Sequence, residues 1–361
     1  MSRPRLHQQI DDQGLTERQR EILRLIIQQY VLTANPVGSR YISRISSLGL
    51  SDATLRNVMA DLELLGYIDH PHTSAGRMPT DKGYRLYVDS LMDLEKLSEA
   101  ERHVVRQLLG GAVSPEEVVR ESTSLLAKLS RQLSFLVLPA LDDVLLERVE
   151  IVQLASNRIL IVIAASSGRV RTVTLETESA LDRSQIDKLA SVLNERLSGR
   201  TFREVKTIFR EAIQDLPEDS KSILRVFVDT PEKLFEDPMS ERVKLSGASN
   251  IFAQPEFLKR TAFTNDEFQS IIELIENREV VIHVLEKSGI MGTQKPHEVS
   301  IRIGSELEDE RMANYSIIST RFRVGDENGT IALIGPKRMN YARMMPLVEY
   351  VAYAMSNSIV P

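Results

Sequence analysis

The stretch from residue 16 to residue 92 constrains the fold most, because capped helices alternate there with short turns. Thr16 and Gln19 have the spacing of a capping box, in which each side chain bonds the other residue's backbone. Apolar residues then recur every three or four positions, which predicts an amphipathic helix over residues 16–33. Asn35-Pro36 is expected to end it.

A second, shorter helix is expected at about residues 39–46. Ser39 is its predicted N-cap, and Ile42 and Ile45 are its predicted buried residues. Gly49 follows in the sequence SSLGL, where a left-handed residue after a helix favours glycine. The segment therefore ends in a tight turn.

A third helix is predicted at residues 51–65, with Ser51 as its N-cap. Its inner stripe is expected to consist of Leu55, Val58, Met59, Leu62 and Leu65. Two short strands at 67–69 and 77–79 form a ribbon, and Thr80 caps a further helix. Two helices joined by a glycine-containing turn make a helix-turn-helix, and the ribbon makes it winged.

Polar residues on the outward side of the third helix are candidates for reading DNA. Arg56 and Asn57 point outward near its N-terminus, the part of a recognition helix that enters the major groove. Arginine pairs with guanine and asparagine with adenine. The full predicted interface adds the start of the short helix, the ribbon and the helix after it: Ser39, Arg40, Ser51, Thr54, Arg56, Asn57, His72, Thr73, Ser74, Arg77, Lys82 and Arg85.

Net charge gives weak support to a nucleic-acid partner. Residues 1–92 hold 11 Lys/Arg and 10 Asp/Glu, while the whole chain has a net charge of −6. Nucleic-acid binders usually show a clearer basic face. The prediction of double-stranded DNA as partner therefore depends on where charges lie, and a winged helix that binds a protein stays open as an alternative.

The remaining residues predict an α+β arrangement. Charged helices are expected over 93–135, and Leu133–Pro139 is a continuous apolar run typical of a buried strand. A meander of three antiparallel strands follows, divided by short turns at 156–157 and 166–168. Helices are then predicted at 182–198, 201–214 and 231–236.

From residue 243 the pattern changes to a strand and a helix followed by several strands. A strand is expected at 244–252 and a helix at 264–277, and further strands at 280–287, 297–305, 315–324 and 329–336 precede a last helix at 340–357. This order is typical of a sensor-like domain of the GAF or PAS type. We therefore expect a winged helix at 1–92, a discontinuous GAF-like domain at 93–142 and 239–361, and an inserted domain at 143–238. In the GAF-like domain, residues 133–139 are expected to pair with strands more than 100 residues later.

The sequence lacks motifs of catalysis and of cofactor binding. Cysteine is absent, which excludes disulfides and thiolate ligands. There is no P-loop, GxGxxG, HExxH or GxSxG motif, and the neighbouring pair His70 and His72 is too small a ligand set for a metal. We expect no enzyme activity, no cofactor and no metal.

Neither a membrane span nor a signal peptide is expected from the sequence. The longest apolar run, Arg158–Ser166, is shorter than the roughly 18 residues that a membrane span needs. The first 14 residues contain no apolar stretch of the kind found in signal peptides. A cytoplasmic protein without a membrane partner is expected.

Three stretches resemble a known family. They are RQREILRLIIQQYVLTANPVGSR, LSDATLRNVMADLELLGYIDHPHTSAGRMPTDKGYRLYVD and IALIGPKRMNYARMMPLVEYVA, and they resemble HrcA, the bacterial heat-inducible transcription repressors. The resemblance covers nearly the whole chain and is most specific over residues 16–92. It implies a homodimer that binds an inverted-repeat operator, called CIRCE, upstream of chaperone operons. It also implies an inserted dimerisation domain and maintenance of activity by the GroE chaperonin.

Two interpretations of residues 93–361 remain. No convergent set of polar residues indicates a ligand there, so a dimerisation scaffold without a small-molecule ligand is favoured. The alternative is a transcription regulator that senses a small molecule in the GAF-like domain.

Overall fold

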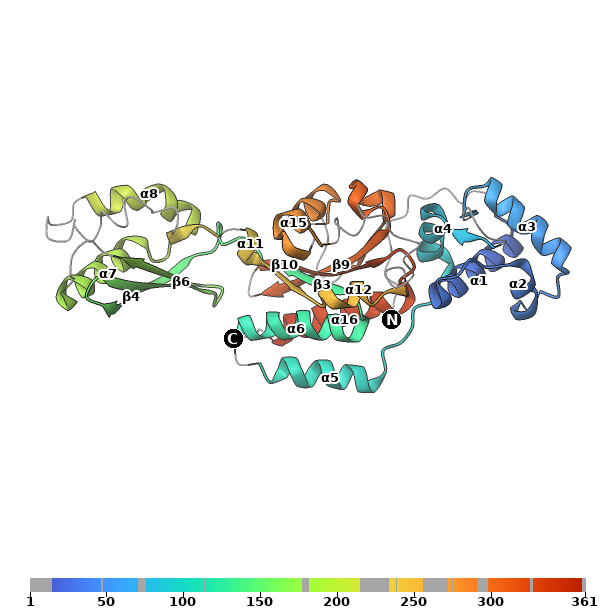
Figure 1. Ribbon diagram of the computed structural model, residues 1–361. Helices are drawn as coiled ribbons and strands as arrows, with labels where there is room; N and C mark the ends of the chain where they lie inside the picture. The colour runs from blue at the N-terminus through green and yellow to red at the C-terminus, as the bar shows by residue number, and fades with distance from the viewer. Residues whose placement is uncertain are drawn as a thin grey trace.

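The computed structural model describes residues 15–46, 48–70, 76–112, 114–176, 182–214, 234–237, 239–255, 272–273, 275–290, 298–324 and 327–358. Three parts follow one another along the molecule (Figure 1). The N-terminal helices lie at one end, a five-stranded sheet with its helices lies in the middle, and a three-stranded sheet with two helices lies at the other end. In these ranges no helix is long and apolar enough to cross a membrane.

The N-terminal part has the predicted order of elements. These are α1 (Glu17–Thr33), α2 (Ser39–Ile45), α3 (Asp52–Leu64), β1 (Ile68–Asp69), β2 (Met78–Pro79), α4 (Asp81–Leu86) and a π-helical turn (Tyr87–Leu91). Thr16 and Gln19 form the predicted capping box, and Gly49 has the predicted left-handed conformation with φ of 61°. Buried apolar residues of α1 and α3 form the core of this part. The predicted winged helix-turn-helix is therefore confirmed.

Three local predictions here are wrong. Gly38 is the N-cap of α2, so Ser39 is already the first helical residue. Ile45 and Leu65 are 42% and 44% exposed, respectively. Each lies at the C-terminal end of its helix, where the inner stripe stops with the helix itself.

The middle part is built on a sheet with the strand order β7-β3-β10-β9-β8. Its strands are β3 (Leu133–Val137), β7 (Val243–Ser246), β8 (Ser300–Ile303), β9 (Tyr315–Val324) and β10 (Glu327–Pro336). All five residues of β3 are buried, and β3 lies between β7 and β10 as an antiparallel neighbour of both. This confirms the predicted pairing across more than 100 residues of sequence.

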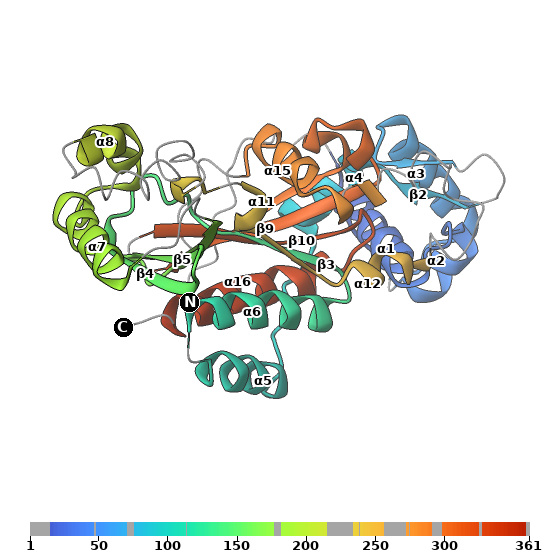
Figure 2. The same ribbon diagram turned by 60° about the vertical axis from the view of Figure 1, so that its left-hand side comes forward.

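Helices cover both faces of this sheet. On one face lie α6 (Pro115–Ser130) and α16 (Tyr341–Ser358), with α5 (Glu99–Gly110) outside them (Figure 2). On the other face lies α15 (Arg278–Lys287). Side chains of β10 alternate between the two apolar clusters, because Ile331 and Leu333 pack toward α16 while Ala332 and Ile334 pack toward α15.

Two strand predictions in the middle part are wrong. Residues 280–287 form most of helix α15, which Asn277 caps by accepting a hydrogen bond from the Glu279 N–H at 3.0 Å. Residues 244–252 form a strand only to Ser246, after which α12 (Ala248–Phe252) begins. Gly247 separates the two elements with φ of 81°, a conformation that favours glycine. Helix α15 thus replaces one predicted strand, and helix α12 replaces the second half of the other.

The third part is the predicted antiparallel meander. It consists of β4 (Leu146–Ala155), β5 (Arg158–Ala165) and β6 (Val170–Glu176), with α7 (Arg183–Leu197) and α8 (Phe202–Gln214) packed on one face. A short helix α11 (Met239–Arg242) leads back to β7. Of the predicted helix at 231–236 only residues 234–236 lie within the described part, and of the helix at 264–277 only residues near its end do. The α+β class is confirmed.

Candidate nucleic-acid interface

Helix α3 is fixed at its N-terminus by one hydroxyl. Ser51 Oγ accepts a hydrogen bond from the Thr54 N–H at 3.2 Å and lies 3.0 Å from Thr54 Oγ1. A serine N-cap contributes about 1 kcal/mol to a helix. The inner side of the helix is held by Leu55, Val58, Met59 and Leu62, all buried. Ser51 and Thr54 therefore determine where the helix begins.

Arg56 and Asn57 lie next to each other on the outer side of α3. Both residues are exposed. In the part of the chain that the structure describes, neither side chain has a hydrogen-bond or ion-pair partner. Their donors and acceptors are therefore available to another molecule, as the sequence predicted.

Helix α2 contributes a second exposed basic group. Arg40 is exposed at its start, beside the partly buried Ser39. Tyr41 Oη donates a hydrogen bond to Gln29 Oε1 at 2.6 Å, which ties α2 to α1. Arg44 is also exposed and lies one helical turn after Arg40. Sequence reasoning missed Arg44, although a spacing of four residues places two side chains on one helical face.

The wing is anchored to the helices at its base. The backbones of Val37 and Arg77 exchange two hydrogen bonds of 2.8 and 2.9 Å. Arg77 Nε donates to Glu63 Oε2 of α3 at 2.8 Å, and the Arg77 side chain is only 19% exposed. The predicted contacts His72, Thr73 and Ser74 lie outside the described residues. Arg77 thus fixes the wing on α3 and offers little surface for a phosphate.

Lys82 is engaged at the other end of α3. Its Nζ donates to the Leu65 carbonyl at 2.9 Å and lies 4.4 Å from the centre of the Tyr67 ring. An ammonium group at this position satisfies a carbonyl at the helix C-terminus, where cations are favoured. Lys82 therefore stabilises the C-terminal end of α3.

The prediction that Arg85 belongs to the DNA interface is wrong. Its guanidinium donates to Glu306, to Asp89 and to the carbonyl oxygen of Ile301. Glu306 and Ile301 belong to the middle part of the molecule, so the side chain points away from α3. The sequence pattern placed it near the wing because α4 follows β2 directly, but α4 uses this face to contact the sheet domain.

Within the described residues, a metal site does not compete with this interpretation. Across the described ranges, no group of three or more His, Asp or Glu side chains is placed to hold a metal ion. The site is therefore a surface of donors and cations: Arg40 and Arg44 on α2, and Arg56 and Asn57 on α3.

An exposed recognition helix, a shorter helix before it and a two-stranded wing after it define a winged helix-turn-helix DNA-binding protein. The chain belongs to the HrcA family. Residues 14–91 match the winged helix-turn-helix transcription repressor domain described as HrcA DNA-binding, and residues 116–345 match the HrcA protein C-terminal domain.

Relatives at full length support the assignment. The chain is 40% identical to the heat-inducible transcription repressor HrcA of Chlorobium phaeobacteroides (strain BS1), over 96% of this chain and 98% of that protein. It is 37% identical to the protein of the same name from Chlorobium limicola, over 97% and 99%. A crystal structure described only as a hypothetical protein matches with a TM-score of 0.63 at 24% identity, covering 96% of this chain and 99% of that one. That likeness concerns the fold.

Proposed function

We propose that this chain represses chaperone operons by binding an inverted-repeat operator of the CIRCE type as a homodimer. The observation that carries the proposal is the exposed, unengaged pair Arg56 and Asn57 on a helix whose other face is buried. Membership of the HrcA family supplies the class of operator. The proposal includes no enzyme activity, cofactor or metal.

The interface divides into residues that read bases and residues that position the protein. Arg56 and Asn57 would contact base edges in the major groove. Ser39 and Arg40 at the start of α2 would contact phosphate, which fixes register without reading sequence. Arg77 and Lys82 hold the wing and the end of α3, so they act on DNA binding through the position of α3.

Arg56→Ala tests the reading assignment. Loss of a bidentate contact to guanine should weaken operator binding by about 1–3 kcal/mol and relax base preference at one position of each half-site. Arg106→Ala is a matched control, because Arg106 is an exposed arginine of α5 in the middle part. Titrations against operator and scrambled duplexes at fixed salt measure both effects. Unchanged operator affinity of Arg56→Ala would show that α3 does not read the bases.

The homodimer proposal has its own structural support, the outer face of the three-stranded sheet. Helices α7 and α8 pack on the opposite face. On the outer face Val152, Leu154 and Val170 are 44%, 52% and 55% exposed. Val152 pairs with Leu160 across the strands, which makes the apolar surface continuous. Exposed apolar patches of this kind mark interaction sites.

The double substitution Val152→Glu with Leu160→Glu tests this interface. Carboxylates on both strands should convert the dimer to a monomer at micromolar concentration. Leu108→Glu is the control, because Leu108 is an exposed leucine of α5 in another part of the chain. Sedimentation measures the mass. A double variant that remains dimeric would exclude this face as the interface.

We also propose that residues 93–142 and 239–361 together form a GAF-like domain and that residues 143–238 form a dimerisation domain. We further propose that the GroE chaperonin modulates the activity of the protein in the cytoplasm. The family resemblance supports the chaperonin link. Addition of chaperonin to the operator titration tests it: a raised fraction of DNA-binding protein is expected, and no change argues against it.

A ligand-responsive regulator is the second candidate, and one observation favours it. A cavity of about 820 Å³ lies between α6 and the β5–β6 hairpin, lined by Val119, Ile163, Arg169, Arg171 and Lys244 among others. Its volume is in the range of small-molecule sites. A bound ligand would raise the melting temperature by linkage. A broad thermal-shift screen without any hit would count against this candidate.

A further inference from the structure

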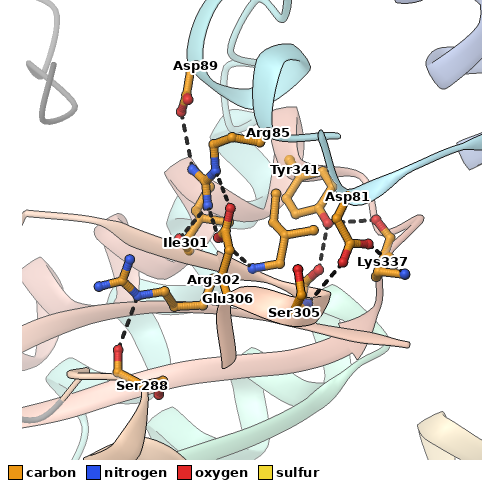
Figure 3. Close-up of polar contacts among 12 residues, drawn as sticks. Asp81, Arg85, Asp89, Ser288, Ile301, Arg302, Ser305, Glu306, Lys337 and Tyr341 are labelled. Carbon is orange, nitrogen blue, oxygen red and sulfur yellow. Dashed lines mark hydrogen bonds and ion pairs between the residues drawn. The ribbon is translucent and has the colours of Figure 1, made fainter. Parts of the chain in front are cut away.

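The winged helix is docked on the middle part through charged contacts at the start of α4. Lys337 Nζ donates to Asp81 Oδ1 at 2.6 Å, and the Ser305 N–H donates to Asp81 Oδ2 at 2.9 Å (Figure 3). Asp81 belongs to α4, whereas Ser305 and Lys337 follow strands β8 and β10. One carboxylate therefore joins two loops of the sheet domain to the winged helix.

A second contact lies one turn further along α4. Arg85 Nε donates to Glu306 Oε1 at 2.8 Å, and its second amino group reaches both Glu306 Oε2 and the Ile301 carbonyl (Figure 3). The guanidinium and the carboxylate thus meet in a two-point contact, which has one preferred orientation. Asp89, in the π-helical turn that follows α4, accepts a further bond from Arg85 at 3.2 Å.

Close packing surrounds these contacts. The rings of Tyr84 in α4 and Tyr341 in α16 lie 6.0 Å apart, and both are buried. At Gly304 a Cβ would lie 2.7 Å from Asp81 Cγ, so only glycine lets the carboxylate approach this closely. Arg338 also donates to the Val31 carbonyl near the end of α1, at 3.3 Å.

The linker to the winged helix has no regular secondary structure, and it is tied to the sheet domain at Glu95, whose N–H donates to the Ala342 carbonyl at 3.0 Å and whose Oε1 accepts from Asn340 Nδ2 at 2.9 Å. Residues 92–98 have no helix or strand assignment and join the π-helical turn to α5. The three residues 92–94 before Glu95 reach up to about 11 Å when extended. The orientation of α3 relative to the rest of the protein therefore depends on the contacts that α4 makes with the sheet domain, and we call the two charged pairs among them, Asp81–Lys337 and Arg85–Glu306, the docking contact.

We propose that the docking contact determines which half-site spacing the repressor accepts. In a dimer, each recognition helix is held at a fixed angle to the dimer axis as long as α4 stays docked. Two fixed heads fit only half-sites at one separation and one rotation on the duplex. This inference rests on the proposed dimeric, operator-reading function. The four side chains are 23–28% exposed, so the contact is mostly shielded from solvent.

The test combines two substitutions that keep side-chain size and remove charge, Lys337→Met and Glu306→Gln. The matched control is Lys206→Met with Glu241→Gln, because Lys206 pairs with Asp142 at 2.7 Å and Glu241 lies beside Arg171, both away from the winged helix. Each protein is titrated with three duplexes: the inverted repeat, a form whose spacer is about 5 base pairs longer, or half a helical turn, and a single half-site.

Wild type and control should lose on the order of 100-fold in affinity on the lengthened operator, because only one head then engages. The docking variant should lose less than about 10-fold, because its tethered heads reach both half-sites. Its affinity for the single half-site should equal that of wild type. Lys337→Arg, which keeps the charge, should retain the wild-type spacing preference.

A docking variant that discriminates spacing as sharply as wild type overturns the inference and leaves the proposed function intact. Wild type that binds the inverted repeat no better than the single half-site overturns the dimeric function itself, and the inference with it. Should the double variant not fold, as judged by its melting curve, Lys337→Met alone keeps the Arg85 contact and must show an intermediate loss of spacing preference.

Discussion

Gly83 lies in the middle of α4, where glycine is unfavourable, and we predict that alanine at this position destabilises the protein. A Cβ at Gly83 meets the carbonyl oxygen of Tyr67 and lies 3.2 Å from its carbonyl carbon. That carbonyl is not free to move, because it accepts a hydrogen bond from the Thr80 N–H at 3.1 Å. The backbone at Tyr67, directly before β1, thus approaches α4 at the distance that glycine permits.

The sign of the effect follows from three magnitudes. Helix propensity alone would stabilise Gly83→Ala by about 1 kcal/mol. Overpacking against a rigid neighbour costs about 1–3 kcal/mol. Loss of the Thr80–Tyr67 hydrogen bond, if β1 moves away, costs a further ~1 kcal/mol. The expected net change is a loss of roughly 2 kcal/mol, the difference between these contributions.

Gly110→Ala is the matched control for this prediction. Gly110 ends α5, and a Cβ there meets nothing within 4 Å. Only helix propensity acts at this position, so the substitution should stabilise by up to about 1 kcal/mol. Urea unfolding and thermal melts followed by circular dichroism compare both variants with wild type. A Gly83→Ala protein as stable as wild type or more stable would refute the packing argument.

Three further substitutions test the contacts around the site. Ser51→Ala should cost about 1 kcal/mol by removing the N-cap of α3, and a melting temperature equal to wild type would speak against that role. Tyr341→Phe should cost about 1–3 kcal/mol, because the partly buried Lys337 carbonyl loses its donor at 2.6 Å. An unchanged urea midpoint would contradict this. The hydrogen bond from Arg311 holds the pKa of Asp309 below its ordinary value. A lowered pKa stabilises the folded state above the unfolded pKa of about 4. That stability is lost as pH falls through the folded pKa. The urea midpoint of Asp309→Asn should therefore depend less on acid pH than that of wild type.

Local signals were sufficient to predict the winged helix. Thr16, Ser51 and Thr80 each stand directly before a helix and cap it as expected. A cap acts on the backbone within three residues, so its effect is visible in a short stretch of sequence. The order of elements in residues 16–92 followed from such signals, and the outward position of Arg56 followed from the apolar stripe.

Residues 280–287 show where local signals mislead. Val280, Val281, Ile282, Val284 and Leu285 favour a strand by their branching and their apolar character. The structure buries all five of them in a helix and leaves His283 exposed. Burial at positions 280, 281, 284 and 285 has the spacing of a helical face, but a short apolar run fits both periods. The local sequence therefore leaves the choice open, and in the structure the segment packs as a helix on the five-stranded sheet.

The role of Arg85 could not be read from the sequence for a different reason. Its carboxylate partner in the middle part, Glu306, lies 221 residues away, and Lys337, the partner of Asp81, lies 256 residues away. In residues 1–92 the nearly balanced charges gave no hint that Arg85 is neutralised by the middle part while Arg56 is not. A count of charges treats Arg85 and Arg56 alike. Their contacts differ, because Arg85 holds the winged helix in place whereas Arg56 is free to contact DNA. If the docking contact sets half-site spacing, operator recognition by this protein depends on both kinds of arginine.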